Sequence, residues 1–218
     1  MRKTLFMKSK PTHSGDSIGA DSANEASTAD FSLADLMRAI KDAEDGQRPV
    51  ESWEPALCGD IDIVIKSDGT WHHEGTRITR TGLIELFASV LRKDEDGQTY
   101  LVTPVEKLKI TVERAHFIAT RVDISGEGET AQLFFTTDYG GTVQAGADNL
   151  IRVQTDPNTL EPAPFVNVRG RLEASLTRPV FYELVEHARE IDTPDGPQLG
   201  VYSGGVFFPL GPPNAHNA

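Results

Sequence analysis

The chain has 218 residues, enough for one large domain or two small ones. Its hydrophobic fraction of 38% and charged fraction of 25% are ordinary for a globular protein with a sizeable core. Asp and Glu (33) outnumber Lys and Arg (21), which gives a net charge of −12. This charge argues against general nucleic-acid or anionic-membrane binding, because both rely on Lys and Arg contacts to phosphates.

Cys58 is the only cysteine, so no intramolecular disulfide can form, as is typical of cytosolic proteins. Its neighbours predict a half-buried, inert thiol. The first apolar stretch is too short for a signal peptide, and no run approaches the roughly 18 apolar residues of a membrane span. We therefore expect a cytoplasmic protein without membrane segments.

Two ends of the chain are predicted to be tails. Residues 1–30 are rich in small polar side chains, so we expect them to be disordered, and 213–218 form a second, short tail. Order should begin at Phe31 with a helix that has Ser32 as its N-cap and ends near Gly46.

The next elements are a hairpin and a helix. Apolar residues alternate from Ile61 to Ile65, an Asp-Gly turn follows, and Trp71 opens a returning strand. A helix is predicted from Thr81 to about Lys93, because its apolar residues fall on one face.

Several strands and a second firm helix complete the pattern. The helix is expected from about Pro179 to Arg189, and a hairpin over 201–210 closes the chain. We therefore predict an α+β fold of two halves, 31–112 and 113–212, with mostly antiparallel strands, one main helix per half and an N-terminal helix. The strands expected between the helices are Tyr100–Val102, Leu108–Val112, Phe117–Ile124, Ala131–Phe135, Val143–Ala145, Leu150–Val153 and Phe165–Val168.

A short match suggests internal duplication. Ile78-Thr-Arg80 before one helix recurs as Leu176-Thr-Arg178 before the other, at an offset of 98 residues. The other interpretation is that the match arises without duplication, because any amphipathic helix needs a capping residue at its start and an apolar face.

Several blocks of the sequence resemble the bacterial family called domain of unknown function 1285, over roughly Phe31 to Leu210. The resemblance implies a duplicated α+β core whose C-terminal half is loosely similar to a pleckstrin-homology domain. It also implies a ligand site between the halves, for a nucleotide-type molecule in signalling. The chain departs from the family pattern at Arg114-Ala-His116, where Asp-Ala-Pro is expected. The matching blocks are Cys58-Gly-Asp-Ile-Asp-Ile63, Asp68-Gly-Thr-Trp71, Leu86-Phe-Ala-Ser-Val-Leu91, Leu101-Val-Thr-Pro-Val-Glu-Lys107 and Arg178-Pro-Val-Phe-Tyr-Glu-Leu184.

Arg80 and Arg178 are the main candidates for ligand binding. Each is predicted at a helix N-terminus, where a cation is disfavoured by about 0.3–1 kcal/mol unless an anion lies nearby. That anion could be an internal carboxylate, such as Asp60 or Asp62 beside Arg80, or a ligand phosphate or carboxylate bound by both arginines in one cleft. Plain solvent exposure is the third interpretation.

Three further residues are added to this ligand site. Arg169 would bring positive charge near Arg178 or lie on a solvated strand face. Trp71 could stack on a base, although aromatic residues in hairpins usually belong to the core. His72 precedes His73, but adjacent strand residues point to opposite faces, so we expect no metal site.

The leading hypothesis is a non-enzymatic module that binds a small anionic ligand, without a cofactor. The alternatives are a protein-interaction scaffold and, with less support, a hydrolase that uses His72, His73 and nearby carboxylates. No Walker loop, dinucleotide fingerprint or nucleophile elbow is present, so we assign no catalytic residue.

Overall fold

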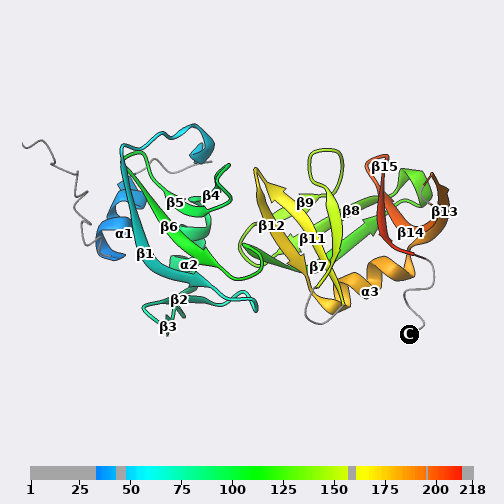
Figure 1. Cartoon of the computed structure of the whole chain (residues 1–218), viewed down its shortest axis with the longest axis horizontal. Coiled ribbons are helices and arrows are strands. Elements are labelled where there is room, and N and C mark those ends of the chain that lie inside the picture. Colours follow the sequence, from blue (N-terminus) through cyan, green and yellow to red (C-terminus); the bar gives the residue numbers. More distant parts are fainter. Residues whose placement is uncertain (1–32, 43–47, 157–160, 195, 213–218) are drawn as a thin grey trace, which may run out of the picture.

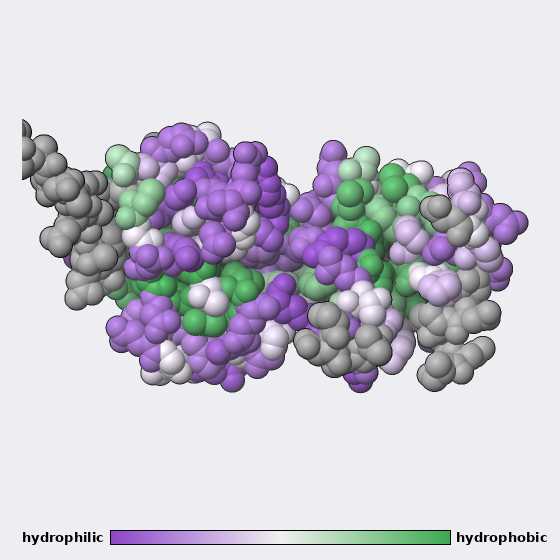
Figure 2. Space-filling view, in the orientation of Figure 1, coloured by the Kyte–Doolittle hydropathy of each residue, from purple (hydrophilic) through white to green (hydrophobic). Residues whose placement is uncertain are grey.

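The computed structural model describes residues 33–42, 48–156, 161–194 and 196–212. Two halves lie side by side along the long axis, with helix α1 at one end and a small third sheet at the other (Figure 1). The visible face is mostly polar, with apolar side chains gathered in a patch over each half (Figure 2). The tails predicted over 1–30 and 213–218, and the Ser32 cap, lie outside the described residues.

Within the described residues, three α-helices and two short 3-10 helices accompany the strands, so the predicted α+β class is confirmed. Helix α1 buries Leu36 and Ile40, while α2 buries Ile84, Phe87 and Ala88. Their bounds are α1 (Leu33–Asp42), η1 (Val50–Ser52), α2 (Thr81–Ala88), η2 (Gly128–Thr130) and α3 (Arg178–Glu186).

The first half contains a six-stranded sheet with the order β3-β2-β1-β6-β5-β4. Two antiparallel three-stranded meanders make up this sheet, and β1 joins them by pairing in parallel with β6. Helix α2 connects the third strand to the fourth. The strands are β1 (Leu57–Ile65), β2 (Trp71–His73), β3 (Thr76–Arg77), β4 (Leu91–Lys93), β5 (Thr99–Val102) and β6 (Glu106–Val112).

The second half repeats this arrangement in a sheet with the order β10-β11-β12-β7-β8-β9. Again two meanders are joined by a parallel pair, here of the first strand (β7) and the last (β12). The two sheets share one topology, which confirms the predicted duplication. The strands are β7 (Phe117–Ser125), β8 (Gln132–Thr137), β9 (Thr142–Gln144), β10 (Ile151–Thr155), β11 (Pro162–Arg169) and β12 (Leu172–Leu176).

A third, three-stranded sheet follows α3 and packs against the second sheet. It comprises β13 (Arg189–Thr193), β14 (Gly196–Ser203) and β15 (Val206–Gly211). The buried Ser203 hydroxyl fixes the contact, because its Oγ accepts a hydrogen bond from Leu133 N at 2.9 Å and donates to Ala145 O at 2.6 Å.

One connected hydrophobic core runs through both halves. Ile63 and Leu108 belong to it in the first sheet, and Phe117, Phe135 and Leu172 in the second. The likeness of the second half to a pleckstrin-homology domain stays a prediction.

Two details of the sequence prediction are corrected. Helix α2 ends at Ala88, because Leu91 and Arg92 turn into β4, where both side chains are buried. The matched Thr-Arg pairs are also not equivalent: α2 lies between the third and fourth strands of its sheet, whereas α3 follows the sixth. The duplication is therefore real, but its register is not the offset of 98 residues.

Candidate functional site: a cleft between the halves

A cleft of about 560 Å³ opens where the β1–β2 turn meets the second half. Ser67 and Asp68 of that turn line one wall. The opposite wall comes from the end of β12 and the start of α3, with Ser175, Thr177 and Arg178. Both halves are therefore needed to form the cleft.

The β1–β2 turn is seated firmly against β7. Gly69 adopts a φ of +81°, and a Cβ atom on it would lie 2.6 Å from Ile118 Cγ1. Only glycine fits this position without strain or displacement. Beside it, Asp68 Oδ1 accepts hydrogen bonds from Thr70 N at 2.9 Å and Thr70 Oγ1 at 2.7 Å. These bonds lower the pKa of Asp68, so its carboxylate stays charged at the cleft.

The start of α3 presents unused hydrogen-bond donors. Thr177 is the N-cap residue, but its side chain makes no capping bond. Because Pro179 has no N–H, the first turn offers the N–H groups of Arg178 and Val180. These groups carry the positive end of the helix dipole.

Ser175 is the polar residue that most favours a ligand site in the cleft. It is only 5% exposed and lines the cleft from the face of β12 opposite the core. Among the hydrogen bonds of the described residues, none uses its hydroxyl. Because Ser175 lines the cleft, this hydroxyl is available to bond a ligand there.

Four charged residues line the cleft, two of each sign. Arg178 Nη2 lies 2.7 Å from Glu161 Oε2, and the two side chains are 73% and 56% exposed. Such an exposed pair contributes about 0–1 kcal/mol, so a ligand can exchange with it. Arg114 lies with its guanidinium 5.8 Å from the Phe165 ring, and Asp68 is the fourth.

Of the two arginines predicted to share a cleft, the structure places only Arg178 in it. Arg80 is the exposed N-cap of α2 and is not among the cleft residues. It also has no ion pair within the described part of the chain, so the proposed bridge to Asp60 or Asp62 is not formed. The solvent-exposed interpretation describes Arg80 best.

Trp71 is a core residue, which corrects the suggestion that it stacks on a ligand. Its side chain is 1% exposed and stacks on Phe87 with ring centroids 6.3 Å apart. The predicted burial of Cys58 is also wrong, because its thiol is exposed rather than half-buried.

His72 lies behind the cleft wall rather than in it. Its Nε2 is 3.1 Å from Thr70 Oγ1, which itself donates to Asp68. It thus supports the turn that carries Asp68. No group of three His, Cys, Asp or Glu side chains suited to a metal ion occurs among the described residues.

Arg169 joins the halves instead of binding in the cleft. Its Nη2 donates to Ala88 O at the C-terminus of α2, at 2.6 Å, and its guanidinium lies 5.7 Å from the Phe117 ring. A cation is favoured at a helix C-terminus. Burial lowers its pKa, partly offset by Glu51, and the role we assign to it is structural.

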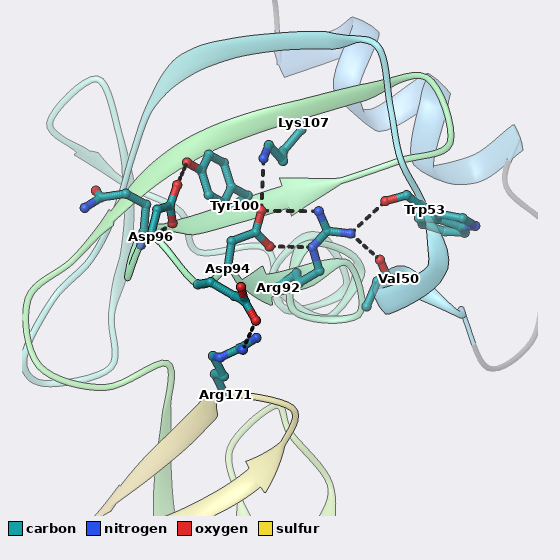
Figure 3. A network of polar contacts seen from close by, with 10 residues as sticks. Val50, Trp53, Arg92, Asp94, Asp96, Tyr100, Lys107 and Arg171 are labelled. Carbon is teal, nitrogen blue, oxygen red and sulfur yellow. Dashed lines mark hydrogen bonds and ion pairs between the residues drawn. The ribbon is translucent and has the colours of Figure 1, made fainter.

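A second connection comes from a polar network around the buried Arg92 (Figure 3). Arg92 donates to the carbonyl oxygens of Val50 and Trp53 at 2.8 and 2.7 Å, and to the carboxylate of Asp94. Beside it, Arg171 of the second half pairs with Glu95 at 2.8 Å. The network therefore fixes the connection after α2 and touches the second half at its edge.

The sequence did not identify Ser67, Asp68, Arg114, Ser175 or Thr177 as site residues. Their convergence depends on how the two sheets pack, which no local pattern encodes. The one available indication was Arg114, where the chain departs from the family pattern.

Two family models cover most of the chain. Residues 48–115 match "Domain of unknown function (DUF1285), N-terminal domain", and residues 116–210 match "Protein of unknown function (DUF1285), C-terminal domain". The chain belongs to the DUF1285 family. No curated protein matches it.

Two solved DUF1285 structures are similar to this chain. A family protein from Silicibacter pomeroyi DSS-3 is 41% identical, with a TM-score of 0.77 over 84% of this chain and 98% of that one. One from Shewanella baltica OS155 is 22% identical, with a TM-score of 0.44 over 57% and 91% of the respective chains. The first of these structures shows that this chain has the DUF1285 fold, and the descriptions of the two family models and of both structures name no activity.

None of the helices in the described ranges is both long and apolar enough to cross a bilayer. The cytoplasmic location stays a prediction.

Proposed function

We propose that this DUF1285 protein binds a small anionic ligand in the cleft between its halves. The observation that carries the proposal is that the Ser175 hydroxyl, which has no hydrogen bond within the described residues, meets the open start of α3 at one cavity. Helix N-termini with free N–H groups are common anion sites. Arg114 and Arg178 add charge on the same cavity.

The cleft has the size and the lining of a small-molecule site. A volume of about 560 Å³ falls within the roughly 300–1,000 Å³ of ligand pockets. Apolar side chains of Ile118, Leu176 and Phe181 lie beside the polar ones. A ligand with an acidic group and an apolar body therefore fits better than a bare ion.

A protein-interaction surface has less support. The large apolar side chains exposed within the described residues are Val105 in the β5–β6 turn, Leu150 just before β10 and Tyr182 in α3. Only Tyr182 borders the cleft. These three side chains are therefore scattered along the chain and do not by themselves mark an interaction site.

The proposal is tested by calorimetry and thermal shift with three anions: inorganic phosphate, adenosine monophosphate and 3-phenylpropanoate. At least one of them should bind, and an Arg114→Ala/Arg178→Ala double variant should raise its Kd at least tenfold.

Two arginines outside the cleft provide matched controls. Arg121 pairs with Asp123 at 2.6 Å on the exposed surface, much as Arg178 pairs with Glu161, and Arg80 starts the other helix. Arg121→Ala and Arg80→Ala should leave the Kd unchanged. Equal losses in all variants, or no binding of any anion, would contradict the proposal.

A further inference from the structure

The two walls of the cleft differ in chemistry. The α3 wall offers hydrogen-bond donors: the Ser175 and Thr177 hydroxyls, the first N–H groups of the helix and the Arg178 guanidinium. The facing wall is the β1–β2 turn, whose charged residue in the cleft is the acid Asp68. A ligand that spans the cleft therefore meets donors at one end and a carboxylate at the other.

Asp68 keeps one carboxylate oxygen for a ligand. Both bonds from Thr70 go to Oδ1, and within the described residues no hydrogen bond uses Oδ2. Because the turn is held by Gly69 against Ile118, this oxygen is fixed relative to the second half. A rigid carboxylate is suited to an ammonium group.

The charges of the cleft favour a balanced ligand over a multiply charged anion. Two arginines face two acids, Asp68 and Glu161. A phosphate dianion would bring two negative charges beside both acids, whereas one carboxylate can replace that of Glu161 on Arg178. Asp68, which lies near Arg77, has an exposed carboxylate that can also accept a cationic group of the ligand.

Apolar side chains also line the cleft. Pro162, Pro164, Ile118 and Phe181 contribute to it. An apolar side chain of the ligand could pack against these residues while the charged groups of the ligand keep their own contacts.

From this arrangement we infer that the ligand is a zwitterion of about dipeptide size, with its carboxylate at the α3 wall and its ammonium group at Asp68. This inference rests on the proposed function: the carboxylate is the anionic group bound at α3, and the ammonium group is a second feature of the ligand. It predicts that one ligand molecule contacts both the β1–β2 turn and α3.

Calorimetry with three forms of one peptide tests the inference: alanyl-phenylalanine, its N-acetylated form and its C-terminal amide. The free dipeptide should bind at least tenfold more tightly than either blocked form. Asp68→Asn retains an acceptor for Thr70 but loses the charge, so it should abolish the preference for the free amine. Asp123→Asn, an exposed acid outside the cleft, is the matched control and should retain it.

The outcomes separate this inference from the proposed function. If the acetylated peptide binds as tightly as the free one, or if only the three simple anions bind, the zwitterion is overturned and the anion site survives. If neither peptides nor anions bind through Arg114 and Arg178, both proposals fail.

Discussion

His116 couples the two sheets through a neutral imidazole. Its Nε2 lies 3.0 Å from Thr99 Oγ1 of the first sheet, and its Nδ1 accepts a hydrogen bond from Glu173 N of the second at 3.1 Å. Since Nδ1 is an acceptor, Nε2 carries the proton and donates to Thr99. Burial, assisted by the nearby charge of Lys93, lowers the pKa of His116 to about 4 from 6.5.

This shift predicts a pH dependence of stability. The unfolded chain takes up a proton near pH 6.5, whereas the folded chain takes it up only near pH 4. The contribution of His116 is therefore complete above pH 6.5 and is lost as the pH falls toward 4, by about 3 kcal/mol. Urea unfolding at a series of pH values measures the loss.

A His116→Gln variant isolates this contribution, because glutamine keeps one donor and one acceptor without titrating. Its stability should vary less with pH between 6.5 and 4 than that of the wild type. Parallel curves for the two proteins would contradict the assignment of this dependence to His116.

At the scale of elements, the β1–β2 turn decides how the halves meet. Gly69 and Gly97 have nearly the same φ, +81° and +79°, but only Gly69 packs closely against the second half. An alanine at either position costs about 1–2 kcal/mol through its backbone conformation. Gly69→Ala should be destabilising by at least 1 kcal/mol more than Gly97→Ala, because its Cβ would overlap Ile118.

Thermal or denaturant unfolding of the two variants gives this difference directly. Gly69→Ala should also weaken binding in the cleft, since the turn carries Ser67 and Asp68. Equal stability of the two variants would mean that the turn is not seated on β7 as described.

The elements also show how far the sequence alone leads. Alternating apolar residues predicted β1 and β6, and α3 begins one residue before its predicted start at Pro179 and ends three residues before its predicted end at Arg189. Helix α2 was predicted too long because Val90 and Leu91 continue its apolar face, although tertiary pairing draws Leu91 into β4. Strand β13 was missed because its residues are mostly polar and exposed.

The same limit applies to the candidate site. Arg178 was found because its charge is unfavourable at a helix start, a local property. Asp68 and Ser175 are far apart in sequence and meet only when the two sheets pack, so no periodicity or spacing could reveal them. Arg80 shares the local pattern of Arg178 but is exposed to solvent. The packing of the two sheets, which the local pattern does not encode, leaves it outside the cleft.

At the scale of the whole molecule, the continuous core predicts cooperative unfolding of both halves. Both tryptophans, Trp53 and Trp71, lie in the first half, so their fluorescence reports on that half, while circular dichroism reports on the whole chain. The two signals should give one coincident transition.

Arg169 provides a test of this coupling. Arg169→Met leaves the Ala88 carbonyl without its donor and should cost about 2 kcal/mol. The neighbouring exposed pair of Arg171 and Glu95 serves as control, since Arg171→Met should cost less than about 1 kcal/mol.

Separate fluorescence and circular-dichroism transitions in the wild type would show that the halves fold independently.

The central claim is that the cleft between the halves holds an anion at the start of α3. An amide NMR titration with 3-phenylpropanoate tests it most directly. Saturable shifts are expected for Ser67, Asp68, Ser175, Thr177 and Arg178, with the signal of Arg80 unchanged, and they should require at least tenfold more ligand in the variant Arg114→Ala/Arg178→Ala. Unchanged cleft signals, or shifts that saturate at the same ligand concentration in that variant, would contradict the account.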